Sequence, residues 1–178
     1  MENASVNIGD QLAGAGCAVL NAEQDGIDIG IYCPVITDPT HKHYLGATRG
    51  TNNTAEVSAI GEALIHLRDY DTSHDDAHVY VDSKYAPAVV EARWGFKSNV
   101  KLIQCIQRIL VQVRAKRNVS FFWVKGHSKD RWNDAADDLA TLGQHLDVRV
   151  RSSCTTGRHA SHATPSTLEC DPRTVMES

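Results

Sequence analysis

The sequence predicts an α/β fold in which a mixed central sheet is flanked by helices. Short apolar segments with the two-residue period of strands occur beside longer segments whose apolar residues recur every three or four positions. The strand-like segments come first and then alternate with helical ones, an order typical of mixed α/β sheets. The chain has 178 residues, which suits one domain with a sizeable core and a tail.

Three strands are expected in the first part of the chain. Residues 14–20 (GAGCAVL) follow a glycine-rich turn, and residues 27–33 (IDIGIYC) place alternate isoleucines on one face. Residues 42–48 (KHYLGAT) are expected to form the third strand.

A helix follows over residues 54–68, where alanine and leucine side chains share one stripe. Asn53 is its expected N-cap, and Glu56 lies three positions later, as in a capping box.

The second half alternates strands and helices. Residues 78–82 (HVYVD) form a short strand that ends on an acid, and a short helix is expected from Ser83. Residues 100–116 and 131–143 show the apolar spacing of amphipathic helices. Residues 119–124 (VSFFWV) are apolar on both faces, which predicts a buried, central strand.

The composition changes near residue 144, so residues 1–144 are expected to form the domain. Residues 145–178 are rich in serine, threonine, arginine and histidine, which predicts a disordered tail. No apolar run approaches the ~20 residues of a membrane span, and no signal peptide is expected. The five cysteines contain no CxxC pair, which favours reduced thiols in an intracellular compartment, nuclear or cytoplasmic. Because the net charge is -4, any nucleic-acid surface must be local.

Three acids occupy positions from which carboxylates can converge. Glu56 lies in the first turn of a helix, Asp82 at the carboxyl end of a strand, and Asp137 in the last helix. Ligand sites in α/β proteins lie at such strand ends. Divalent cations such as Mg²⁺ stabilise converging carboxylates, and a pair of ions can activate water and stabilise a leaving phosphodiester oxygen. Each acid also has an ordinary interpretation: a capping box for Glu56, a helix cap for Asp82 and a solvated face for Asp137.

Four segments, in order, resemble motifs of the type 1 ribonuclease H family, which includes cellular enzymes and domains of reverse transcriptases and retrotransposons. They are residues 14–20, 51–64 (TNNTAEVSAIGEAL), 80–86 (YVDSKYA) and 122–140 (FWVKGHSKDRWNDAADDLA). The resemblance covers about residues 13–143. It implies a ribonuclease H-like fold and a metal-dependent endonuclease that hydrolyses the RNA strand of RNA–DNA hybrids, leaving a 5′-phosphate and a 3′-hydroxyl. A monomeric domain is also expected.

The resemblance also implies residue roles. Glu56, Asp82 and Asp137 match the carboxylates that bind two Mg²⁺ or Mn²⁺ ions, and His127 matches a loop histidine that helps water attack or product leave. Small polar side chains suit contacts with 2′-hydroxyls across the shallow minor groove of a hybrid. Six residues match the positions that contact the hybrid: Thr51, Asn52, Asn53, Ser83, Lys84 and Asn133.

The chain departs from the family pattern at the first strand, which normally ends on a fourth metal-binding Asp. One interpretation is that the chain begins inside the loop after that strand, as a truncated fragment or retrotransposon remnant would. The other is that residues 5–10 (SVNIGD) form a degenerate first strand and Asp10 takes the place of the missing acid. A missing acid favours a second hypothesis, a catalytically impaired or inactive nucleic-acid-binding module.

Two further expectations concern the substrate. A related nuclease or integrase with another substrate is a third hypothesis, which the KGHS loop at 125–128 disfavours. Residues 92–101 (ARWGFKSNVK) are short and mildly basic, so a fused or partner domain is expected to strengthen the grip on the hybrid. Any affinity should fall with salt, because phosphate contacts release counterions.

Overall fold

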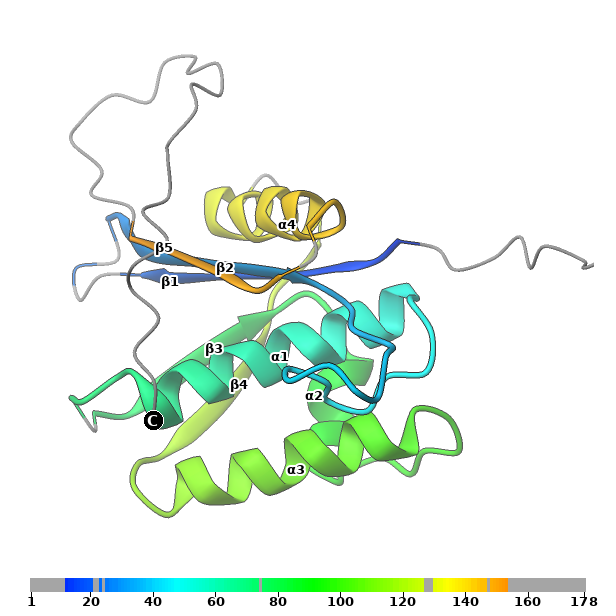
Figure 1. Cartoon of the computed structure of the whole chain (residues 1–178). Helices are drawn as coiled ribbons and strands as arrows, with labels where there is room; N and C mark the ends of the chain where they lie inside the picture. The colour runs from blue at the N-terminus through cyan, green and yellow to red at the C-terminus, as the bar shows by residue number, and fades with distance from the viewer. Residues whose placement is uncertain are drawn as a thin grey trace, which may run out of the picture.

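A computed structural model describes residues 12–20, 23, 25–73, 75–126, 130–146 and 148–153 (Figure 1). The elements, in chain order, are β1 (Gly14–Leu20), β2 (Ile27–Pro34), α1 (Asn52–Asp69), β3 (Ala77–Val81), α2 (Tyr85–Val90), α3 (Val100–Arg114), β4 (Val119–Trp123), α4 (Arg131–Gly143) and β5 (Val150–Ser153). The predicted α/β class is confirmed. Among the described helices, none is long and apolar enough for a membrane span.

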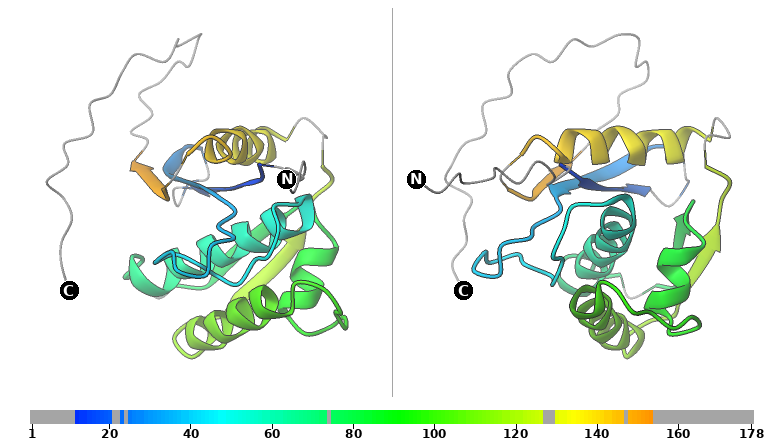
Figure 2. Two further views of the ribbon diagram at one scale, coloured as in Figure 1. Left: turned by 45° about the vertical axis from the view of Figure 1, so that its right-hand side comes forward. Right: turned by 90° about the vertical axis from the view of Figure 1, so that its right-hand side faces the viewer.

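The strands of the described residues form two sheets. β1, β2 and β5 make an antiparallel sheet in the order β1-β2-β5, and β3 pairs with β4 in parallel. Helix α4 lies on one side of the three-stranded sheet, and α1 lies on the other with α3 beyond it (Figures 1 and 2). Both parallel and antiparallel pairs are therefore present, and helices flank the three-stranded sheet on both sides (Figure 1).

The hydrophobic core lies mainly between α1 and α3. Val57, Ile60 and Leu64 of α1 and Ile103 and Ile106 of α3 are at most 2% exposed. This packing fixes the rotation of α1 about its axis. The faces of α1 outside this core are thereby fixed as well, including the one that carries Glu56.

Helix α1 begins two residues earlier than predicted, and its N-cap is Thr51 instead of Asn53. The Thr51 side chain accepts a hydrogen bond from the Thr54 backbone nitrogen at 3.2 Å, and the Thr54 hydroxyl accepts one from the Thr51 nitrogen at 2.8 Å. The capping box is thus made by two threonines. The interpretation of Glu56 as a capping residue is wrong, and its carboxylate is available for another role.

Residues 42–48 do not form the predicted strand; they are a loop of turns and bends. Gly46 has a φ of 110°, which interrupts an extended backbone, and a Cβ at this position would lie 2.7 Å from the Leu102 nitrogen. The partly buried Leu45 packs against the core, which accounts for the apolar character of the segment. The third strand of the antiparallel sheet is β5, which pairs with β2.

Strand β5 lies in the segment from residue 145 onward that is predicted to be disordered; residues from 154 lie outside the described part. Two arginines join β5 and the residue before it to α1. Arg149 forms an ion pair of 2.6 Å with Glu62, and both side chains are at least 91% buried. The Arg151 guanidinium lies 3.8 Å from the centre of the Tyr70 ring. Hydropathy alone does not predict these contacts, because it places both arginines in a solvated tail.

β1 packs closely against α4 because it carries glycines. A Cβ on Gly16 would overlap the carbonyl oxygen of Ala136 and the backbone nitrogen of Ala140. Backbone atoms of a helix cannot rotate away as the end of a side chain can. The glycines of β1 therefore allow the strand and the helix to approach backbone to backbone.

Replacing Gly16 by Ala should lower the free energy of unfolding by about 1–3 kcal/mol, because α4 must move away from β1. Urea unfolding measures this change. Gly95→Ala is the matched control, because a Cβ there meets nothing within 4 Å. Equal destabilisation by both substitutions would contradict the close approach.

His43 should make stability depend on pH. Its Nδ1 lies 3.3 Å from an Arg149 nitrogen, which can only donate, so the ring is neutral. Partial burial and the Arg149 charge lower the pKa of His43 from 6.5 to about 4. Between these values the unfolded chain binds more protons, so stability falls as pH drops through this range.

The matching variant is His43→Gln, which has no imidazole to titrate. Urea unfolding between pH 7 and pH 4 should show a shallower loss of stability for this variant than for the wild type. Parallel curves for the two proteins would show that His43 does not contribute.

Candidate functional site

An open cavity of about 580 Å³ lies between the edges of β1 and β3, with α1 and α4 as its other walls. Neither of these two edges pairs with another strand among the described residues. Several small side chains line the walls, which keeps the space open. The glycines and alanines of the lining are Ala13, Gly14, Gly16, Ala55, Ala59, Ala86, Ala136 and Ala140.

Three elements each bring one of the predicted acids to this cavity. Glu56 of α1 is half-buried, whereas Asp82, directly after β3, and Asp137 of α4 are exposed; all three line the cavity. On α1 the lining residues Asn52, Glu56 and Ala59 recur three or four positions apart, so they share one face of the helix.

The three carboxylates line one cavity but do not form a compact ligand cluster. Among the described residues, no group of three His, Cys, Asp or Glu side chains is placed to hold one metal ion. Mg²⁺ usually keeps several waters and binds through one or two carboxylates. The all-oxygen donors of Glu56, Asp82 and Asp137 therefore suit a hydrated divalent cation in the cavity.

Two residues of the Trp-Val-Lys-Gly segment position Asp82. The Trp123 Nε1 donates a hydrogen bond of 3.0 Å to the Asp82 carbonyl oxygen. A Cβ on Gly126 would lie 3.1 Å from the Asp82 Oδ2, so glycine leaves room for the carboxylate. Both residues lie in the motif at residues 122–140, but the motif alone predicts no role for either of them.

Of the six predicted hybrid-contacting residues, four line the cavity: Thr51, Asn52, Ser83 and Asn133. Ser83 is buried, and its hydroxyl accepts a hydrogen bond of 3.1 Å from the Ala86 nitrogen at the start of α2. The Asn133 Nδ2 is buried and has no hydrogen-bond partner, so it can donate to a ligand.

The remaining predicted residues lie elsewhere. Asn53 and Lys84 are exposed and are not part of the cavity wall. Lys84 places its Nζ 4.4 Å from the centre of the Trp123 ring. His127 and Asp10 lie outside the described residues.

A sequence match shows which protein family the chain belongs to. The model of the RNase H family matches residues 7–145, which is most of the chain. The chain belongs to the RNase H family. The match includes the three cavity acids and the two glycines of β1.

Individual relatives of the RNase H family cover less of the chain. Ribonuclease H of Ruthia magnifica is 37% identical over 102 residues, which are 52% of this chain and 67% of that protein. Ribonuclease H of Methylorubrum extorquens is 33% identical over 135 residues, 70% of this chain and 57% of that protein. The matches thus span about two thirds or less of these relatives.

A solved RNase H structure also aligns with the chain. It is the N-terminal RNase H domain of Rv2228c from Mycobacterium tuberculosis, with 24% identity and a TM-score of 0.45 over 74% of this chain and 90% of that one. At this similarity the family assignment rests on the sequence matches.

Proposed function

We propose that this chain hydrolyses the RNA strand of RNA–DNA hybrids at the cavity between β1 and β3. The observation that carries the proposal is the placement of Glu56, Asp82 and Asp137, three acids of three different elements, around one cavity. Within a family named for this activity, such a placement supports a metal-dependent nuclease centre.

In this reaction, different residues of the chain would bind the metal ions, contact the substrate and move a proton. Glu56, Asp82 and Asp137 would hold two Mg²⁺ or Mn²⁺ ions, which when bound supply an activated water and stabilise the leaving oxygen. The unpaired Asn133 Nδ2 can donate a hydrogen bond to a 2′-hydroxyl in the minor groove of the hybrid. Asn52, exposed at the start of α1, can contact the same groove. His127 is proposed to move a proton near the reacting phosphate.

Cleavage of labelled duplexes tests this proposal. An RNA–DNA hybrid, the matching double-stranded DNA and the matching double-stranded RNA are incubated with the folded chain in Mg²⁺ and in Mn²⁺. We expect cleavage of the RNA strand of the hybrid alone, with 5′-phosphate and 3′-hydroxyl ends. Failure of folded protein to cleave the hybrid in either metal would refute catalysis by this chain.

One observation favours a second candidate, a hybrid-binding module with impaired catalysis. Among the described residues three acids line the cavity, whereas the family pattern has a fourth at the end of a strand. Salt-sensitive binding of the hybrid without cleavage would support this candidate. A monomeric state, an intracellular location (nuclear or cytoplasmic) and help from a fused or partner domain are further proposals.

A further inference from the structure

Three aromatic rings contact one another on the outer face of the β3–β4 sheet. Tyr80 and Phe122 are cross-strand partners whose ring centroids lie 5.3 Å apart at an interplanar angle of 25°. The His78 ring meets the Phe122 ring edge to face, with 5.3 Å between centroids. We call His78, Phe122 and Tyr80 the ring stack.

The ring stack is open to solvent, unlike the other face of the same two strands. Tyr80 is 52% exposed and Phe122 is 42% exposed. On the opposite face, Val79 and Phe121 pack against the hydrophobic core. This explains why the prediction of a buried, central β4 is wrong: one apolar face of the strand packs inward, while Phe122 on the other face remains at the surface.

Contiguous exposed apolar surface is a feature of ligand- and partner-binding sites, and the ring stack exposes such a surface. The ring stack adjoins the proposed active site, because Tyr80 also lines the cavity that holds Glu56 and Asp82. A flat ligand that stacks on Tyr80 would therefore extend the ring stack into the cavity region.

Charge at the same end of the sheet favours a nucleic-acid ligand. Lys84 is exposed, and its Nζ lies beside Trp123 at the carboxyl ends of β3 and β4. The exposed Lys125 lies two residues after the end of β4. Lysines at the carboxyl end of a sheet that carries exposed rings suit a phosphate chain whose bases stack on aromatic side chains. A base inside a duplex is already stacked on its neighbours, so the matching partner is an unpaired base.

We propose that Tyr80, supported by Phe122 and His78, stacks an unpaired base next to the hybrid, so that the chain prefers hybrids with a single-stranded extension. The proposal rests on the proposed function, since it places the paired part of the substrate in the cavity. It assigns Tyr80 a substrate-binding role that the motifs did not indicate.

The test compares a blunt RNA–DNA hybrid with one that carries a short single-stranded overhang whose first base is 2-aminopurine. Binding is measured at low salt in EDTA, which prevents metal-dependent cleavage. Because stacking of a base on an aromatic side chain strengthens binding, we expect the overhang to tighten binding about tenfold and to quench 2-aminopurine fluorescence. Tyr80→Thr should remove both effects, and Phe122→Thr should weaken them.

Two variants serve as controls. Tyr80→Phe keeps the ring and should retain the tightening and the quenching. Val111→Thr changes an equally apolar, 70% exposed residue of α3 and should behave as the wild type. Thermal unfolding of each variant confirms that the fold is intact.

The outcomes separate this proposal from the proposed function. Equal affinity for blunt and overhanging hybrids, or overhang effects that survive in folded Tyr80→Thr, would overturn the stacking proposal while leaving the nuclease proposal intact. If the blunt hybrid is neither bound nor cleaved but a single strand still shows quenching that depends on Tyr80, the stacking site stands and the proposed function fails.

Discussion

Replacing Asp82 by Asn should reduce cleavage of the hybrid at least about 100-fold, since loss of groups that merely support metal ligands already costs about 10–100-fold. The substitution removes a negative charge from the cavity and keeps the size of the side chain. Trp123 can still donate its hydrogen bond to the backbone carbonyl of residue 82, so the local fold should persist. Initial rates in Mg²⁺ and Mn²⁺ measure the effect.

Asp138→Asn is the matched control for this prediction. Asp138 is an exposed acid of α4, next to Asp137 in sequence, but it does not line the cavity. It should therefore retain the activity of the wild type. Comparable loss in both variants would point to a general effect of surface charge on hybrid binding and would contradict a specific role of Asp82.

Replacing Arg149 by Met should lower the free energy of unfolding by about 3–5 kcal/mol, because it leaves the Glu62 carboxylate buried without its partner. The Glu62 side chain is 3% exposed, and its Oε2 already has no hydrogen-bond partner. Burial raises the pKa of Glu62, and the loss of Arg149 would remove the main interaction that opposes this shift. Urea unfolding at neutral pH measures the change.

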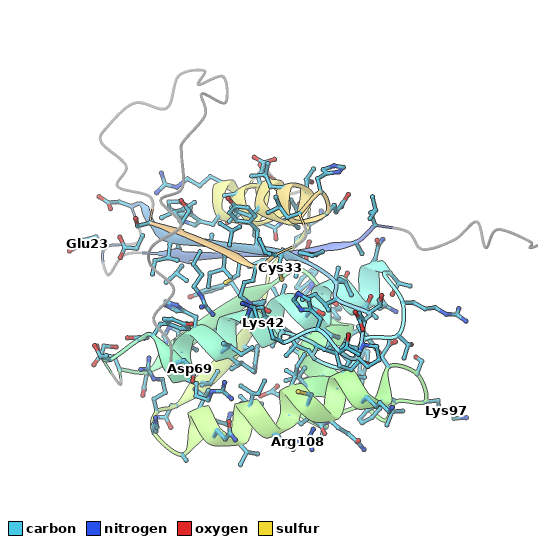
Figure 3. All side chains as sticks on the ribbon, viewed as in Figure 1. Glu23, Cys33, Lys42, Asp69, Lys97 and Arg108 are labelled. Atoms are coloured by element: carbon cyan, nitrogen blue, oxygen red, sulfur yellow. The ribbon has the colours of Figure 1, made fainter. Side chains whose placement is uncertain are left out.

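A double substitution distinguishes a lost ion pair from lost packing. Glu62→Leu combined with Arg149→Met removes both charges and should recover much of the stability, because an apolar pair has no desolvation cost. The site favours such a replacement: Cys33 lies beside it between the sheet and α1 (Figure 3), and burial raises the pKa of its thiol to about 12. A double variant less stable than Arg149→Met alone would contradict this account.

Local pattern was enough to predict most of the helices and strands. The alternation in residues 27–33 and the helical spacing in residues 100–116 predicted β2 and α3, because burial of one face dictates both periods. The failures have a common cause, which is long-range contact. Residues 42–48 have the apolar character of a strand because Leu45 packs against the core, although the segment is a loop. β5 depends on the contact of Arg149 with Glu62, which lies 87 positions away in the sequence.

The sequence likewise predicted the acids of the candidate site but not the contacts that support them. The motifs named Glu56, Asp82 and Asp137, and the structure places all three on one cavity. The supporting contacts of Trp123 and Gly126 with Asp82 depend on the spatial pairing of β3 with β4, which no local pattern encodes. The exposure of Tyr80 and Phe122 likewise depends on which face of β4 the helices cover.

The metal centre proposed for Glu56, Asp82 and Asp137 can be tested by titrating the folded chain with Mn²⁺ while electron paramagnetic resonance measures the free ion. We expect saturable binding that weakens in Glu56→Gln, Asp82→Asn and Asp137→Asn alike and is unchanged in Asp138→Asn. Binding that is absent in the wild type, or indifferent to all three substitutions, would contradict it.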